Sequence, residues 1–400
     1  MRIGSGQRRG GAPFLTQLLT AASLATALVF SPSSAGLSLP EDLLQFEFNH
    51  YTGSFGVDVL YPAVSVQKQI TENLSVSGRY LVDAITSASM RSRFDVDGVT
   101  SATTQSSGGD EHTFEEVRHE VGGGIARRLG SGIGNLHGIY STENDYSSRS
   151  VVASISYPLW DQNTELHAGL VRSWDEVSPV HRDWTRKKDL TKVRAGWTQV
   201  LTTRMIAQVN YTRTHMTGYL SDPYHVVSIL DLDRQEVVNY EAVHPDRRDR
   251  SAIGMSMKVK SSDDSAVEFG YRRYWDSWSV DSDTIHALYQ QRLFQGGLTL
   301  GLEVRGYSQG RAGFFRPEYD APEQHMTVDI RLETGRSMEY TLRWSLPGTV
   351  VHGLGIVDGT ALDLDGSFGF YRRKTTTADW HSRSRELNAL VSRVGFRYRY

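Results

Sequence analysis

The sequence contains no cysteine among its 400 residues. Without cysteine the fold has no disulfide framework, and thiol chemistry is excluded. The formal net charge of -3 is close to neutral for a chain of this length, so no nucleic-acid partner is expected. Beyond residue 35 no segment approaches the roughly 20 consecutive apolar residues that a membrane-spanning helix requires. If the mature chain crosses a membrane, it therefore does so with strands.

The N-terminus has the pattern of an export signal. Basic residues precede an apolar run at 14–30, and the small residues Ser33 and Ala35 follow it at the spacing of a cleavage site. The alternative is a membrane anchor, but several polar residues interrupt the run. We predict a signal peptide over 1–35 and a single mature domain over 36–400, so that the mature protein is exported.

The mature chain repeats an alternation of apolar and polar residues with a period of two, which is typical of strands. In the segment 337–346, Met338 and Leu342 lie on one face, and Glu339 and Arg343 lie on the other. No sustained helical periodicity follows the signal peptide, so we expect an all-β chain with many strands. Further alternating segments occur at 74–84, 151–159, 205–213, 253–259, 267–275, 298–307 and 362–371.

The connections between these segments alternate in length. Short polar turns are predicted at 71–73, 130–134, 160–164, 202–204, 261–264 and 295–297. Long polar loops are predicted between them, at 86–113, 177–188, 218–250 and 309–323. This layout is typical of a transmembrane antiparallel up-and-down β-barrel with short periplasmic turns and long extracellular loops. A soluble sandwich has no reason to sort its loops in this way. Counting gives about 16 strands, with 14 or 18 as alternatives.

Aromatic residues support a membrane barrel over a soluble β-sandwich. Alternation alone does not distinguish the two, because both have one apolar and one polar face on each strand. Aromatic girdles at the two membrane interfaces, however, are specific to membrane proteins. The residues predicted near strand ends are Tyr80, Trp160, Trp197, Tyr211, Tyr271, Trp275, Tyr307, Trp344 and Tyr371.

The last eleven residues, LVSRVGFRYRY, keep the alternation up to the final residue. Phe396, Tyr398 and Tyr400 are expected on the lipid face of the closing strand, while Arg393 and Arg397 point inward. A terminal aromatic residue resembles the signal that the barrel assembly machinery recognises in outer-membrane barrels. Most proteins of that class end in Phe, so the terminal Tyr is a mild departure.

The chain resembles a narrower family, the proteobacterial outer-membrane barrels classed as domain of unknown function 3570. The segments that carry the resemblance are SVSGRYLVDAITSASM (75–90), RSWDEV (172–177), TGYLSDPYHVV (217–227), YRRYWDSWSVDSDTIHALYQQRL (271–293) and GFFRPEY (313–319). It covers nearly the whole mature chain. The family has no established activity. The resemblance implies a location in the outer membrane of a Gram-negative bacterium, contact with outer-membrane lipid, and a connection to exported redox-related proteins.

The predicted inner face carries charges of both signs, which favours a porin-like channel for small solutes or ions. The alternative is a non-conducting scaffold or binding barrel that works with an exported redox-related partner. In that case the charges would pair and fill the bore. The eight residues predicted to line the pore are Arg393, Arg397, Arg343, Arg305, Glu303, Glu339, Arg272 and Glu268.

Enzymatic activity is the least favoured interpretation. A hydrolase at the rim would need Ser, His and a carboxylate in triad geometry, and pairs such as His137 with Ser141 or His286 with Ser282 belong to no motif. Several histidines near loops could in principle bind a metal, but none has the spacing of a metal motif. We therefore predict no catalytic residue, no metal and no cofactor. These histidines are His112, His181, His215, His225 and His244.

Overall fold

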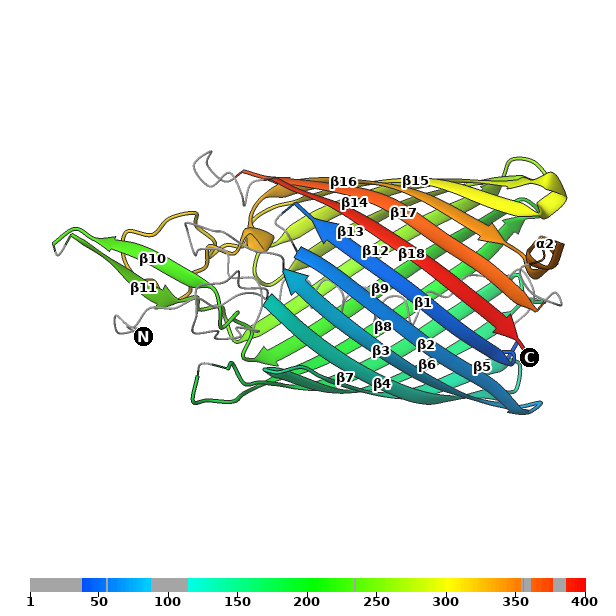
Figure 1. Cartoon of the computed structure of the whole chain (residues 1–400), viewed down its shortest axis with the longest axis horizontal. Helices are drawn as coiled ribbons and strands as arrows, with labels where there is room; N and C mark the ends of the chain where they lie inside the picture. The colour runs from blue at the N-terminus through cyan, green and yellow to red at the C-terminus, as the bar shows by residue number, and fades with distance from the viewer. Residues whose placement is uncertain are drawn as a thin grey trace.

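A computed structural model describes residues 38–54, 57–87, 114–180, 182–233, 235–353, 355, 361–376 and 386–400. Within these residues sixteen antiparallel strands form one closed barrel (Figure 1). Each strand pairs with its neighbours along the chain, β9 pairs with β12, and β1 closes the barrel against β18. The strands are β1 (Leu43–Gly53), β2 (Val57–Thr71), β3 (Leu74–Ser87), β4 (Phe114–Leu129), β5 (Gly132–Thr142), β6 (Tyr146–Leu159), β7 (Thr164–Val177), β8 (Arg186–Thr202), β9 (Met205–Gly218), β12 (Arg247–Lys260), β13 (Ser265–Asp276), β14 (Asp281–Leu293), β15 (Leu298–Gln309), β16 (Gly335–Leu346), β17 (Leu362–Thr375) and β18 (Glu386–Arg399).

The outer face of the barrel is apolar, and this confirms the predicted fold class. On β15, Leu302 and Val304 are 59% and 42% exposed, whereas Glu303 between them points to the interior. The side chains of Phe269 on β13 and Ile285 on β14 are exposed to a similar extent. So much exposed apolar surface is costly in water and matches the hydrocarbon core of a membrane. Among the described residues no helix is long and apolar enough to cross a membrane.

Two residues of the predicted aromatic girdle do not face lipid. Tyr307 has the same parity on β15 as Glu303, so its side chain lies on the inner face, where its hydroxyl donates to Gln309 at 2.7 Å. Tyr371 shares the inner parity of β17 with Asp365. Proximity to a strand end was therefore an insufficient criterion, because the position along a strand and the face are independent properties.

The connections differ at the two ends of the barrel, as the sequence predicts. At one end, the turn end, short connections such as 130–131 and 203–204 join the strands, and the start of β1 and the C-terminus of the chain lie there (Figure 1). Gly130 takes a φ of 63° in its turn, a conformation that favours glycine. The short turn predicted at 295–297 contains the single-turn 3-10 helix η1 (Phe294–Gly296). The exception is the longer connection between β16 and β17, which carries the six-residue helix α2 (Gly348–Gly353).

The opposite end, the loop end, carries the long connections. The connection after β9 contains a two-stranded hairpin, β10 (Val226–Asp231) and β11 (Glu236–Glu241), that projects away from the barrel (Figure 1). The segment around residue 237 is therefore an external hairpin. The connection between β15 and β16 includes η2 (Ile330–Leu332). Most of the predicted loop 86–113 lies outside the described residues.

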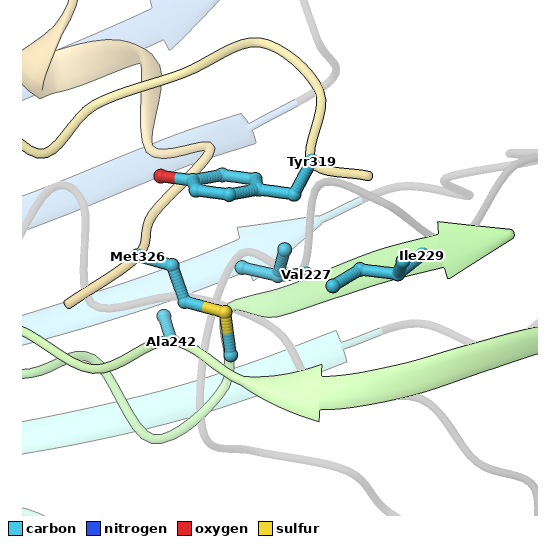
Figure 2. Close-up of a cluster of buried hydrophobic side chains, with 5 residues drawn as sticks. All are labelled: Val227, Ile229, Ala242, Tyr319 and Met326. Atoms are coloured by element: carbon cyan, nitrogen blue, oxygen red, sulfur yellow. The ribbon is translucent and has the colours of Figure 1, made fainter. Parts of the chain in front are cut away.

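The loop end also contains a compact apolar core. Val227 and Ile229 from β10 pack with Ala242, Tyr319 and Met326 (Figure 2). The two long loops that supply these side chains are far apart in sequence, so the cluster ties them into one unit. We call the described residues of 219–246 and 310–334 the loop bridge.

The N-terminal residues 38–40 enter the barrel at the turn end. Leu39 is buried against Ala126 and Ile133, which lie on the inner faces of β4 and β5. The Pro40 carbonyl accepts a hydrogen bond from the Ser75 hydroxyl at 3.1 Å. The predicted signal peptide over 1–35 lies outside the described residues.

Candidate functional site

The inner wall of the barrel is the candidate site, because it gathers the charged residues that alternation predicted to point inward. All eight of those residues lie on the inner parity of their strands. On the opposite face of these strands lie exposed apolar side chains such as Phe269, Leu302, Leu342 and Val394. The wall therefore combines a lipid-compatible exterior with a densely charged interior.

The seam of the barrel carries a network of ion pairs. Arg393 on β18 contacts Glu47 on β1 at 2.6 Å and Asp365 on β17 at 2.8 Å. Arg397 contacts the other oxygen of Asp365 at 3.0 Å. Arg399, one step nearer the turn end, pairs with Asp363. These contacts neutralise the two predicted arginines and link the first strand to the last two.

Three more pairs involve the remaining predicted residues. Arg343 pairs with Glu303, and Arg305 lies 3.3 Å from Glu339, so β15 and β16 are joined at two levels. On β13, Glu268 lies 3.5 Å from His286 of β14. Arg272 differs from the other seven, because its contact is with the ring of Tyr274, at 5.7 Å.

These pairs run along the wall and not across the bore. Each joins side chains on adjacent strands, and the same holds for Arg79 with Glu120 on β3 and β4. Pairing between neighbours leaves the centre of the lumen free of salt bridges in the part of the chain that the structure describes. A barrel of sixteen strands is wide enough to enclose an aqueous interior unless other segments fill it.

A cavity of about 870 Å³ occupies the turn end of this interior. Its lining comes from an arc of strands that runs from β5 to β15, and includes Glu165, His167, Lys258 and Gln290. Ser38, the first residue that the structure describes, also lines the cavity. Most lining side chains are polar or charged, as a water-filled space requires.

At the loop end the loop bridge spans the barrel mouth. On one side the Tyr224 hydroxyl donates to Asp145 in the connection between β5 and β6. On the other side Arg373, on the inner face of β17, donates to the Ile330 carbonyl. Strands β5 and β17 lie on opposite sides of the closed strand order. The bridge therefore crosses the opening between them.

A buried charge cluster joins the two loops of the bridge. Arg331 lies 2.9 Å from Asp222 and 2.6 Å from Asp329, and His225 lies 3.1 Å from Asp222. Both carboxylates are almost fully buried. Asp222 and Arg331 are 109 positions apart in sequence, so no local pattern could have revealed the cluster.

The cluster shifts the pKa values of its members in opposite directions. Burial by itself would raise the pKa of Asp222 and Asp329, but His225 and Arg331 outweigh it and hold both values well below the usual range. Burial by itself would lower the pKa of His225, but the two carboxylates raise it above its usual value. The ionised forms of all four groups thus stabilise one another.

The remaining histidines are scattered. Burial lowers the pKa of His244 to about 4, and its ring packs between Trp278 and Phe314 as a neutral part of the loop core. His215 faces outward on β9 and lies 2.9 Å from Asp249. His112 and His181 lie outside the described residues. No group of three side chains suited to a metal ion occurs where the structure describes the chain.

The Ser and His pairs considered from sequence are not triads. His286 is engaged by Glu268, as described above. A closer approach occurs at the cavity, where Ser156 and Glu165 lie 2.9 and 3.4 Å from His167. Both contacts are to the same ring nitrogen, Nδ1, whereas a triad needs the nucleophile and the carboxylate on opposite nitrogens.

Sequence reasoning missed a cationic patch on the inner wall. It consists of Lys192 and Arg194 on β8, Arg250 on β12 and Arg272 on β13. None of the four has an ion pair with a carboxylate among the described residues, in contrast to the arginines near the seam. Of the four, only Arg272 is among the eight residues predicted to line the pore. Lys192, Arg194 and Arg250 lie on the inner parity of their strands, so the same alternation signal points to them.

The C-terminal residues take the predicted faces. Phe396 and Tyr398 lie on the outer parity of β18, and the ring of Phe396 meets Phe48 of β1 edge to face at 6.2 Å. The Tyr400 hydroxyl donates to the Gln67 carbonyl at 3.1 Å. The final residue is thus fixed to the second strand of the barrel.

The closed sixteen-strand barrel, apolar outside and charged inside, is the fold of outer-membrane β-barrel proteins. Within that class, a family model described as protein of unknown function (DUF3570) matches residues 16–189 and 180–350, and the chain belongs to this family. This confirms the resemblance seen in the sequence. No curated protein matches the chain in sequence.

Solved structures align with the chain at very low sequence identity. A bacterial polysaccharide outer membrane secretin aligns with a TM-score of 0.50 and 8% identity, over 90% of this chain and 100% of that chain. Pseudomonas aeruginosa OpdK with vanillate aligns with a TM-score of 0.42 and 10% identity, over 89% and 98%. The CymD monoaromatic hydrocarbon channel aligns with a TM-score of 0.40 and 11% identity, over 90% and 89%.

Proposed function

We propose that this protein is a porin-like channel in the outer membrane of a Gram-negative bacterium, which lets small ions and solutes pass through its charged lumen. The turn end would face the periplasm and the loop end the exterior, as in other outer-membrane barrels. Passage would be passive, because a static charged wall supplies selectivity but no energy.

One observation carries the proposal: within the described residues, the ion pairs of the inner wall join side chains of the same strand or of neighbouring strands. Charges that filled the bore would have to pair across it, as the scaffold hypothesis requires. Here they lie along the wall, and a cavity of about 870 Å³ is present at the turn end. The proposed role of Arg393, Arg305 and the other six predicted residues is to set the electrostatic field in this space.

A second candidate, a non-conducting binding barrel, is favoured by the loop bridge. The bridge crosses the mouth and ends in the projecting hairpin β10 and β11 (Figure 1). The apolar side chains Leu232 and Val237 near the hairpin tip are 79% and 61% exposed, and such residues suit contact with another protein. The partner under this hypothesis would be an exported redox-related protein.

The two candidates are separated by conductance. We expect purified mature barrel, inserted into a planar bilayer, to give discrete and reproducible current steps, because the bore is aqueous along its paired wall. A second recording uses a variant in which residues 310–334 are replaced by a short glycine and serine linker. This variant removes half of the loop bridge and should conduct more, since the mouth is then wider. A folded and inserted barrel that stays silent in both forms would refute the channel and favour the binding barrel.

A further inference from the structure

The cationic patch has an ordered arrangement that the strand register defines. Strand β9 lies between β8 and β12, and Thr214 on β9 pairs with Lys192 on one side and with Arg250 on the other. Adjacent strands are about 4.8 Å apart, so the backbones that carry these two cations are roughly 10 Å apart. Arg194 lies two residues from Lys192 on the same face. The charges of the patch are therefore near one another along the inner wall.

The nearest carboxylate of the register is already engaged. Asp276 is the cross-strand partner of Arg250, but Arg248 donates to its Oδ2 at 2.8 Å, and so does the Tyr274 hydroxyl at 2.6 Å. Its Oδ1 accepts from the backbone N–H of Trp278 at 2.9 Å. Asp276 thus anchors the loop end of β13 and leaves Arg250 without a counter-charge.

The inner-face carboxylates on these strands and their neighbours are engaged in the same way. Asp175 on β7 contacts Lys188 at 3.2 Å and accepts hydrogen bonds from two serine hydroxyls. Glu268, on the same strand as Arg272, is paired with His286. The fold therefore satisfies its acidic groups with other cations and leaves the four patch residues in excess.

Glycines flank two residues of the patch in the strand register. Arg194 has Gly169 as its partner on β7, and Arg272 has Gly254 as its partner on β12, so neither has a cross-strand side chain opposite it on that side. Thr212 and Thr214 supply hydroxyl groups between the cations. Hydroxyls and guanidinium forks together form the donor set that carboxylate and phosphate oxygens accept from.

Like charges placed close together repel one another, and an anion between them relieves that repulsion. We propose that the cationic patch is a binding site for small oxyanions, namely carboxylates or phosphate, and that it makes the lumen prefer anions over cations. The binding of an oxyanion needs only the patch. The preference for anions over cations during passage rests in addition on the proposed channel function.

A single position tests this with a matched pair of variants. Thr214→Asp places a carboxylate between Lys192 and Arg250, whereas Thr214→Asn has nearly the same shape and no charge. In the wild-type barrel under a potassium chloride gradient, we expect the chloride permeability to exceed that of potassium. The Asp variant should lower the permeability ratio by about twofold or more, and the Asn variant should leave it unchanged. A conducting barrel whose ratio is the same in all three proteins would overturn the anion preference and leave the channel intact.

Binding is measured separately from conduction. Calorimetric titration of the full mature barrel in detergent with succinate, and then with inorganic phosphate, should show saturable binding that the Asp variant weakens about tenfold and the Asn variant retains. The relative affinities distinguish carboxylate from phosphate as the ligand class. If Thr214→Asp does not fold, as a gel assay of heat-modifiability would show, Lys192→Gln with Arg250→Gln takes its place. Wild-type protein that binds neither anion would refute the site, and silent protein that binds an anion would refute only the channel.

Discussion

At the residue scale, the inner wall shows how alternation fixes the face of a side chain but not its partner. Arg393 was predicted to point inward because it lies on the face opposite Val394 and Phe396 in a period-two pattern, and it has this parity in the structure. Its partners Glu47 and Asp365 lie 346 and 28 positions away in sequence. Neither could be identified beforehand, because which strands become neighbours at the seam depends on closure of the whole barrel.

This network gives a prediction for the double variant Arg393→Ala and Arg397→Ala. The double variant removes two cations and leaves the carboxylates of Glu47 and Asp365 without their partners, so the lumen gains net negative charge at the seam. We expect the reversal potential in a salt gradient to shift toward cation preference.

The control for that experiment is Arg172→Ala. Arg172 is also an arginine paired with a carboxylate, Asp189 at 2.8 Å, but it lies on the outer face of β7. Arg172→Ala should therefore leave the reversal potential unchanged. If the double variant conducts with an unaltered reversal potential, the two seam arginines do not act on permeating ions.

At the scale of elements, the loop bridge is held together by a core and a charge cluster, and the two respond differently to pH. The apolar contacts of Val227, Tyr319 and Met326 do not titrate. The cluster does, because the pKa of His225 is raised while the pKa values of Asp222 and Asp329 are lowered. Because the pKa of His225 is raised, its contribution to stability is fully present below its ordinary pKa. That contribution is lost as the pH rises through the pKa that His225 has in the folded protein. Because the pKa values of the two carboxylates are lowered, their contribution is fully present above their ordinary pKa and is lost as the pH falls through their folded pKa values.

The loop bridge should therefore be most stable at a pH between the ordinary pKa of an aspartate, 3.8, and that of a histidine, 6.5. It should become less stable at alkaline pH. Hydrogen exchange of residues 219–246, corrected for the intrinsic effect of pH, should show greater protection at pH 6 than at pH 9. In His225→Gln the difference should disappear, while exchange of the barrel strands stays the same. Equal protection of the wild-type loop at both pH values would contradict a role for His225 in holding the bridge.

At the scale of the whole molecule, closure joins the first strand to the last over their full length, from Leu43 opposite Arg399 to Gly53 opposite Ala389. The final residue extends this seam to a third strand. Tyr400 bonds the Gln67 carbonyl through its hydroxyl, and Lys68 lies 4.8 Å from its ring centre. The hydroxyl that distinguishes Tyr from the more usual Phe thus has a contact of its own.

We predict that Tyr400→Phe assembles normally, because it keeps the aromatic ring and loses one exposed hydrogen bond worth at most about 1 kcal/mol. Tyr400→Ala removes the ring as well and should reduce the fraction of protein that reaches the folded, heat-modifiable form after expression. The fraction is measured on gels with and without boiling. Equal folded fractions for all three proteins would show that the terminal aromatic residue is not an assembly signal.

The sequence by itself determined the all-β class, an approximate count of sixteen strands and the inward face of the eight charged residues predicted for the wall. These properties follow from local rules: side chains of a strand alternate with period two, and glycine and polar residues mark the turns. Only the tertiary structure decided that the pairs at the seam lie along the wall and that Asp222 and Arg331 meet in the loop bridge. It also decided that four cations on β8, β12 and β13 have no ion pair with a carboxylate in the described part of the chain. These depend on which distant strands and loops become neighbours, and that is settled by burial and closure of the complete barrel.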